Sequence, residues 1–182
     1  MQSGYFNLYE FFDSSEHLYD GTIKCIITPQ LQTNLATGSI QMVIGLRIDT
    51  NSGAGKKSLE AFITDSEIDD CIKALKLMKN LASHKSEGKA SRIVFQSGKT
   101  VDFIMTDTSN GWGLRCSVTQ KTEYDRTYYR TNTAGTMWKS KETDDGDSVG
   151  MNIPLDKIDE IIADLQKAKD ILTEAKRKKT AK

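Results

Sequence analysis

The chain has 182 residues, of which 37% are hydrophobic and 27% charged, and its 25 lysines and arginines balance 25 aspartates and glutamates. This composition is typical of a globular protein with one substantial core or two small lobes that share one, and it excludes disordered, collagen-like and coiled-coil chains. The zero net charge does not by itself predict a nucleic-acid binder, although a local basic stripe can exist within a neutral total.

The N-terminus and the cysteines indicate the compartment. The first residues, MQSGYFNLYEFF, lack the basic start and apolar run of an export signal. No stretch of the chain approaches the ~20 consecutive apolar residues of a membrane helix. Cys25, Cys71 and Cys116 stand far apart in apolar patterns, so we expect reduced, buried thiols. The sequence therefore predicts a soluble, cytoplasmic protein without a membrane partner.

Four strands are predicted in the first part of the chain. The aromatic-rich segment 5–12 suits a strand, and apolar residues alternate with period two in residues 21–28 and 38–49. Leu59, Ala61 and Ile63 continue the same alternation. We expect Pro29 to end the second of these strands, since proline cannot donate a ladder hydrogen bond.

A helix is predicted to follow these strands. Thr64, Asp65, Ser66 and Glu67 form the S/T-x-x-E capping-box pattern, and Ile68, Ile72 and Leu75 then recur at helical spacing. We expect this helix to run to residue 82. The polar segment 83–91 contains Gly88 and has no periodicity, which is typical of a linker.

The second half is expected to repeat this order. Residues 93–95 and 101–105 predict a hairpin around the turn Ser97-Gly98-Lys99, and strands are expected at 112–118 and 149–153. Residues 128–139 are a looser strand candidate. Pro154 suits the start of a second helix, which we expect to end near Lys176. The apolar face of that helix is predicted to consist of Ile158, Ile161, Ile162, Leu165, Ala168 and Leu172.

The two predicted strand–helix junctions match without a gap. The segment AFITDSEIDDCIKALKLMKNL, residues 61–81, aligns with MNIPLDKIDEIIADLQKAKDI, residues 151–171, at a constant offset. The aligned pairs are Ile63 with Ile153, Ile68 with Ile158, Asp69 with Asp159, Ile72 with Ile162, Leu75 with Leu165 and Lys79 with Lys169. Because both halves also share the same order of elements, we interpret the chain as a tandem duplication.

The predicted fold class is therefore α+β. It consists of two tandem β-β-β-β-α repeats, in which each curved antiparallel sheet is backed by one amphipathic helix. The expected boundaries are 1–82 for the first repeat, 83–91 for the linker, 92–177 for the second repeat and 178–182 for a basic tail. We expect the repeats to form one integrated domain.

This pattern resembles the PUR-repeat proteins and the related Whirly family. The residues that support the resemblance are GSIQMVIGLRI and KKSLEAFITDSEIDDCIKALKLMKNL in the first half, and WGLRCSVTQ and SVGMNIPLDKIDEIIADLQKAKDIL in the second. The resemblance implies paired curved sheets with crossed helices that bind single-stranded nucleic acid, commonly as a dimer or larger ring.

A single-strand site needs aromatic rings that stack on bases and cations that follow phosphates. Segment 123–141 is the richest aromatic and basic mixture in the chain, and Arg47, Arg115 and Lys121 are expected on polar strand faces. The alternative for the aromatic residues is that they pack in the core or pair across strands. The candidate nucleic-acid-binding residues are Arg47, Lys56, Lys57, Arg115, Lys121, Tyr124, Arg126, Tyr128, Tyr129, Arg130, Trp138 and Lys139.

Two further basic segments have simpler interpretations. Residues 53–58, GAGKKS, do not form a phosphate-binding loop, because Thr50 stands where the first glycine is required and Lys57 follows Lys56. We interpret them as a hairpin loop. The tail EAKRKKTAK fits either a helix C-terminus complemented by cations or a phosphate-binding arm.

No catalytic or metal-binding pattern accompanies these features. His17 and His84 are the two histidines of the chain, and both lie in polar, loop-like stretches without a second ligand at metal-binding spacing. The carboxylates near Asp69 are explained by helix capping and the helix dipole. We therefore predict a protein that is not an enzyme and that uses neither a metal nor a cofactor.

The sequence favours one function and leaves a second open. The first is binding of single-stranded DNA or RNA through sheet-face aromatic and basic residues, by a homodimer or higher oligomer. The alternative is a structural or protein-interaction module that self-associates or assembles into a larger particle, since open sheet edges and amphipathic helices are natural association surfaces.

Overall fold

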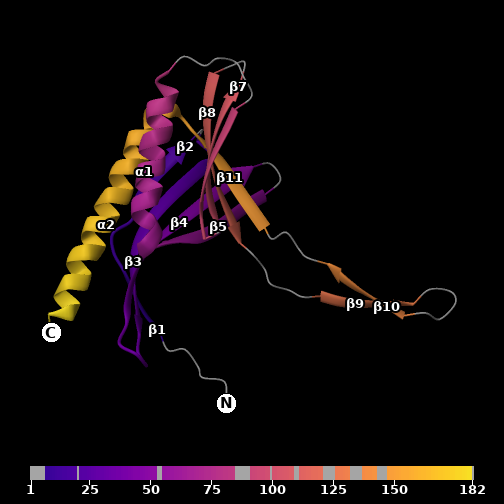
Figure 1. The fold of residues 1–182 in the computed structure, drawn as a ribbon, viewed down its shortest axis with the longest axis horizontal. Coiled ribbons are helices and arrows are strands. Elements are labelled where there is room, and N and C mark those ends of the chain that lie inside the picture. The colour runs from indigo at the N-terminus through magenta and orange to yellow at the C-terminus, as the bar shows by residue number, and fades with distance from the viewer. Residues whose placement is uncertain are drawn as a thin grey trace.

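The computed structural model describes residues 7–19, 21–52, 55–84, 91–98, 100–108, 111–120, 126–131, 137–142 and 147–181. The protein is α+β, with one five-stranded and one four-stranded antiparallel sheet and two long helices (Figure 1). This confirms the predicted class and the predominance of antiparallel strands.

The first sheet is built from residues 7–64. Its strands are β1 (Asn7–Phe11), β2 (Ser15–Tyr19), β3 (Ile23–Asn34), β4 (Ile40–Ser52) and β5 (Gly55–Thr64), in the order β1-β3-β4-β5, with β2 also paired to β3. β1 pairs with the second half of β3 and β2 with its first half, so together they form one interrupted edge. The single strand predicted near the N-terminus is thus followed by a second short strand, β2, which was not predicted.

The prediction that Pro29 ends a strand is wrong. β3 continues through Pro29, which pairs with Ile44 of β4. Its carbonyl accepts a hydrogen bond from the backbone N–H of Phe12 at 3.0 Å, so the polar backbone side of Pro29 faces the edge formed by β1 and β2. That edge is interrupted between Phe11 and Ser15. Because the ladder is already broken there, the missing N–H of proline leaves no partner unsatisfied.

The second sheet has the order β6-β7-β8-β11. Its strands are β6 (Ser91–Ser97), β7 (Val101–Thr108), β8 (Gly111–Gln120) and β11 (Asp147–Ile153). The predicted turn after Ser97 is confirmed by a hydrogen bond of 2.9 Å from the Thr100 N–H to the Ser97 carbonyl, with Gly98 at a φ of 54°. Between β8 and β11, the strands β9 (Arg126–Thr131) and β10 (Met137–Glu142) form a separate two-stranded sheet. Figure 1 shows this hairpin standing away from both larger sheets.

The two helices lie side by side (Figure 1). α1 (Asp65–Ala82) begins with the predicted capping box of Thr64 and Glu67. A short 3₁₀ turn, η1 (Leu155–Lys157), follows Pro154 and leads into α2 (Ile158–Thr180). α2 extends beyond the expected end at Lys176, so most of the predicted basic tail is helical. All six residues predicted for the apolar face of α2 are buried.

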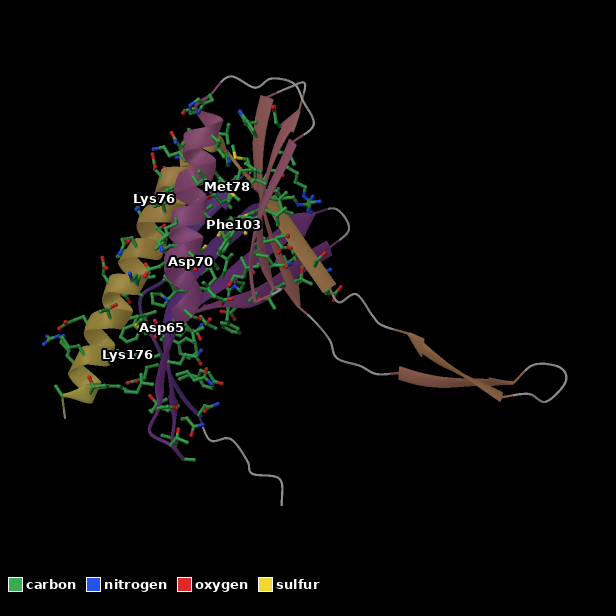
Figure 2. All side chains as sticks on the ribbon, in the orientation of Figure 1. Asp65, Asp70, Lys76, Met78, Phe103 and Lys176 are labelled. Carbon is green, nitrogen blue, oxygen red and sulfur yellow. The ribbon has the colours of Figure 1, made fainter. Side chains whose placement is uncertain are left out.

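One continuous hydrophobic core joins both halves of the chain. In Figure 2, Met78 of α1 and Phe103 of β7 point into this core, and each is 1% exposed. Burial of a side chain of this size contributes about 1.5–3 kcal/mol. α2 packs against β3 and β4, while α1 contacts β4, β5 and β6. The contacts therefore do not confirm one backing helix for each sheet, because α2 lies over the sheet of the first half.

Candidate nucleic-acid interface

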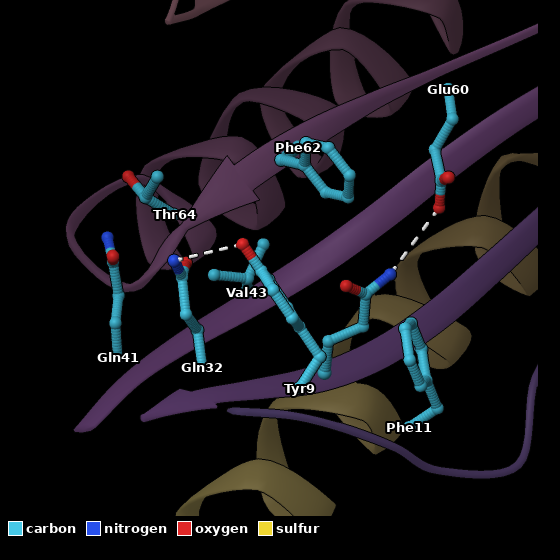
Figure 3. Close-up of a pocket in the computed structure, with 9 residues that line it drawn as sticks. Tyr9, Phe11, Gln32, Gln41, Val43, Glu60, Phe62 and Thr64 are labelled. Carbon is cyan, nitrogen blue, oxygen red and sulfur yellow. Dashed lines mark hydrogen bonds between the residues drawn. The ribbon is translucent and has the colours of Figure 1, made fainter. Parts of the chain in front are cut away.

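The first sheet has a groove on the face opposite the core. Strand alternation buries Ile44, Leu46 and Ile48 of β4, so the intervening side chains of β4 lie on the outer face. Side chains of β1, β3, β4 and β5 surround a groove of about 420 Å³ there (Figure 3). The groove is lined by Tyr9, Phe11, Gln30, Gln32, Gln41, Val43, Glu60, Phe62 and Thr64.

Three aromatic rings project from the two sides of this groove. Tyr9 and Phe11 come from β1 and Phe62 from β5, and these side chains are 49%, 65% and 44% exposed. Between them, glutamine amides of β3 and β4 form the floor, and the Gln32 amide donates a hydrogen bond of 3.3 Å to the Tyr9 hydroxyl. Exposed rings beside amide donors and acceptors can stack on flat ring systems and bind their polar edges.

Gly45 gives two polar side chains room to meet in this groove. The Gln30 amide, on a residue that is 4% exposed, donates a hydrogen bond of 3.4 Å to the Glu60 carboxylate. A Cβ at Gly45 would lie 2.5 Å from Oε1 of Glu60 and 2.7 Å from Nε2 of Gln30. The absence of a side chain at Gly45 is therefore what allows this pair to lie flat across the sheet.

The outer face of the second sheet has a different chemistry. A groove of about 590 Å³ includes Arg115 and Asn152 among its lining residues, and it extends to Trp112, which packs against the core. The Arg115 guanidinium lies over Gly150, where a Cβ would come within 2.6 Å of its Nε and Nη2 atoms. Trp112 is oriented by a hydrogen bond of 3.1 Å from its ring N–H to the carbonyl of His84.

The predicted basic residues of the two sheets differ in their surroundings. Arg47 forms an ion pair of 3.2 Å with Asp49 and stands opposite Glu60 in the β4–β5 register. Lys56 and Lys57 lie in strand β5, not in the expected loop, and Lys57 forms an ion pair of 3.0 Å with Asp147. Among the described residues, Arg115 has no acidic partner at ion-pair distance.

The predicted aromatic and basic segment is divided between strands. Lys121 and Tyr124 lie outside the described residues. Arg126, Tyr128, Tyr129 and Arg130 belong to β9, and Trp138 and Lys139 belong to β10. In the register of this hairpin, Arg130 pairs with Trp138 and Tyr129 with Lys139. Only the backbone of these two strands is described, so the prediction that their side chains bind nucleic acid stays a prediction.

Sequence reasoning missed the groove of the first sheet. Its members Tyr9, Phe11 and Phe62 were not among the candidates. A signal was present, because Phe62 is a large apolar residue on the polar side of an alternating strand, between buried Ala61 and Ile63. An aromatic residue out of phase with the core pattern indicates a ring presented to solvent.

The three thiols are free and buried, as predicted. Burial raises the pKa of Cys25 to about 12, with a further contribution from Asp164, and it raises the pKa of Cys71 to about 12 as well. Cys116 is shifted in the same direction, also chiefly by burial. These thiols stay protonated at neutral pH and act as small apolar core groups.

His17 lies in β2 and not in the loop that we expected. Its Nε2 atom contacts the carboxylate of Asp164, and its Nδ1 atom lies 3.6 Å from the carboxylate of Glu160. The two carboxylates of α2 meet opposite ring nitrogens, so they cannot converge with the imidazole on one ion. Across the described ranges, no three histidine, cysteine, aspartate or glutamate side chains are grouped as metal ligands.

The chain matches no model of a known protein family, and no curated protein is significantly similar to it. Within the part of the chain that the structure describes, no helix has both the length and the apolar character needed to cross a membrane.

Proposed function

We propose that this protein binds single-stranded nucleic acid on the outer faces of its sheets and is not an enzyme. The observation that supports this proposal is the groove of the first sheet, where Tyr9, Phe11 and Phe62 expose their rings around glutamine amides. Rings of this kind can stack on bases, and the amides can bind base edges. The resemblance to PUR-repeat and Whirly proteins points to the same function.

The tandem repeat is part of this proposal, and the helices support it. Lys79 forms an ion pair with Asp159, and Lys169 forms one with Asp69, each at 2.6 Å. In the alignment of the two halves, Lys79 corresponds to Lys169 and Asp69 to Asp159. Exchanging the two halves therefore converts the Lys79–Asp159 ion pair into the Lys169–Asp69 ion pair. This relation is expected for two copies of one unit related by a pseudo-twofold axis.

Fluorescence anisotropy of a labelled oligothymidylate tests the function. Phe62→Ala is expected to weaken binding by about 1–3 kcal/mol, the contribution of one stacked base. Leu35→Ala is the matched control, because Leu35 is also an exposed apolar residue but does not line the groove. Absence of binding by the wild-type protein at low ionic strength would refute the proposal.

The β9–β10 hairpin makes a separate prediction. Arg130→Ala is expected to weaken binding of all sequences similarly and to reduce the salt dependence, since an arginine there would contact phosphate. Trp138→Ala is expected to lower the affinity but to leave the salt dependence unchanged, because stacking releases no counterions. Equal salt slopes for the wild type and Arg130→Ala would exclude a phosphate contact at this position.

Self-association is a second candidate, and the edge of the first sheet favours it. The edge formed by β1 and β2 exposes Leu8, Phe11 and Leu18. Open edges with exposed apolar side chains tend to pair with another chain. The molar mass in solution, measured by light scattering with and without oligonucleotide, distinguishes a protein that only self-associates from one that also binds nucleic acid.

A further inference from the structure

The two sheets have equivalent positions on their outer faces. Ile63 is the last core-facing residue of β5, and Ile153 is the last core-facing residue of β11. Ile63 pairs with Ile44 of β4, and Ile153 pairs with Leu114 of β8. The next residues on these partner strands are Gly45 and Arg115. Three residues before the two isoleucines stand Glu60 and Gly150. Gly45 thus corresponds to Arg115, and Glu60 to Gly150.

At this pair of positions the two sheets carry opposite charges. In the first sheet a carboxylate, Glu60, lies over a glycine of β4; in the second a guanidinium, Arg115, lies over a glycine of β11. Both sheets therefore place a charged side chain over a glycine of the neighbouring strand. The charged residue belongs to β5 in the first sheet and to β8 in the second, so the two corresponding positions have exchanged their residue types. A polyanion would be repelled at the first site and attracted at the second.

A second arginine extends the basic character of this face. Arg92 of β6 pairs with Thr106 of β7, and Arg115 of β8 pairs with Ile104, two residues earlier on the same face of β7. Both arginines therefore lie in neighbouring rows on the face opposite Phe103 and Met105. Arg92 and Arg115 are both exposed, and neither forms an ion pair with another described residue. Among the described residues of this face, one is acidic: Asp102, which stands opposite Ser117.

From this geometry, and on the basis of the proposed function, we infer that the two sheets divide the recognition of the strand. Arg92 and Arg115 on the second sheet bind backbone phosphates, and the groove of the first sheet binds bases. The Arg115 guanidinium, supported by the bare backbone of Gly150, presents a planar set of donors suited to bidentate contact with a phosphate. Asn152, opposite Arg115 in the register, adds an amide donor.

The salt dependence of oligothymidylate binding tests this division. Each phosphate contact to a single strand contributes about 0.7 to the slope of log K against log salt concentration. Arg115→Gln and Arg92→Gln are each expected to reduce the slope by about that amount, and the double variant by about twice as much. Arg177→Gln is the control, since Arg177 is an exposed arginine of α2 that is paired with Glu174.

The two glycines provide a matched steric test. Gly150→Ala is expected to displace the Arg115 guanidinium and to reduce the salt slope, whereas Gly45→Ala displaces the acidic Glu60, removes no phosphate contact and is not expected to reduce the slope. Wild-type slopes in Arg115→Gln and in Gly150→Ala, with binding retained, would overturn the inference while the proposed function stands.

If the wild type binds no oligonucleotide, the proposed function fails. The anion site is then judged by nuclear magnetic resonance: shifts of the Arg92 and Arg115 Nε–H signals on addition of tripolyphosphate retain it, and unchanged signals reject it.

Discussion

Glu67 shows how one side chain can connect the two halves of the chain. One oxygen of its carboxylate accepts hydrogen bonds from the N–H and the hydroxyl of Thr64, at 3.2 and 2.7 Å, and closes the capping box of α1. The other oxygen accepts a hydrogen bond of 2.8 Å from the N–H of Gly98, in the turn between β6 and β7. Partial burial raises the pKa of Glu67, but these hydrogen bonds outweigh it and hold the pKa below its usual value.

We expect Glu67→Gln to destabilise the protein by about 1 kcal/mol at neutral pH, because glutamine has a single acceptor oxygen and no charge, so it cannot accept the hydrogen bonds of both carboxylate oxygens. The folded-state pKa of Glu67 is lowered, so its contribution is present above the unfolded-state pKa and is lost as the pH falls below about 4. Urea unfolding of both proteins at neutral and acid pH checks this. The expected result is a stability difference that shrinks in acid, and a difference independent of pH would contradict it.

Glu60 is the acidic residue among those that line the groove of the first sheet, which we propose binds bases, and its neutralisation makes a second prediction. Glu60→Gln keeps a side chain that can accept the hydrogen bond from Gln30 but removes a negative charge from the face of the first sheet. We expect tighter binding of oligothymidylate, since repulsion between the carboxylate and nearby phosphates is removed. Titrations at low and high salt measure the effect, which should diminish with salt. Weaker binding would instead show that the carboxylate accepts hydrogen bonds from the ligand.

At the scale of elements, the pairing of α1 with α2 depends on a few ion pairs around an apolar seam. Besides the two reciprocal pairs, Lys176 of α2 forms an ion pair of 2.9 Å with Asp65, and Figure 2 shows these two residues beside each other at one end of the helices. Exposed pairs of this kind contribute little to stability. The buried residues between the helices provide most of the free energy, and the charges select the register.

Charge exchange at the Lys169 and Asp69 pair tests this view. Lys169→Asp places two carboxylates together and is expected to lower the melting temperature, most clearly at low salt. The double variant Asp69→Lys and Lys169→Asp restores opposite charges and should recover most of the loss. Thermal melts followed by circular dichroism measure both variants. Failure of the double variant to recover would mean that the pair is not what fixes the register.

At the scale of the whole molecule, the two halves depend on each other because α2 covers the first sheet. His17 of β2 contacts Asp164 of α2, the Thr173 hydroxyl lies 4.0 Å from the sulfur of Met42, and Lys179 contacts both Glu10 and Thr33. These contacts run from Asp164 to Lys179, along most of α2. Without this helix, the core-facing side chains of β3 and β4 would be exposed to water.

We therefore expect a fragment of residues 1–90 to lack a cooperative thermal transition. Its sheet would expose the apolar face that α2 covers, and the loss of burial exceeds the marginal stability of a domain. Circular dichroism of the fragment alone, and mixed with residues 91–182, measures this. Recovery of the transition on mixing is the expected result, and an independently stable fragment would mean that each half has its own complete core.

The local elements of this protein follow from its sequence. Period-two alternation predicted the long strands, the pattern from Thr64 to Glu67 predicted the start of α1, and helical spacing predicted the buried face of α2. These features depend on neighbours in the chain, so local physics is sufficient to specify them. The strand through Pro29 was mispredicted, because the tolerance of proline depends on a break in the edge at residues 12–14, which strand pairing places beside Pro29.

The site was decided by tertiary structure. Sequence proximity drew attention to residues 123–141, whereas the groove combines Tyr9 and Phe62, which come from opposite edges of a sheet. The two glycines matter because Glu60 and Arg115 reach them across neighbouring strands. The sequence by itself determined which faces are apolar and where helices begin; the register and order of strands determined which side chains meet, since those contacts join residues that no local pattern brings together.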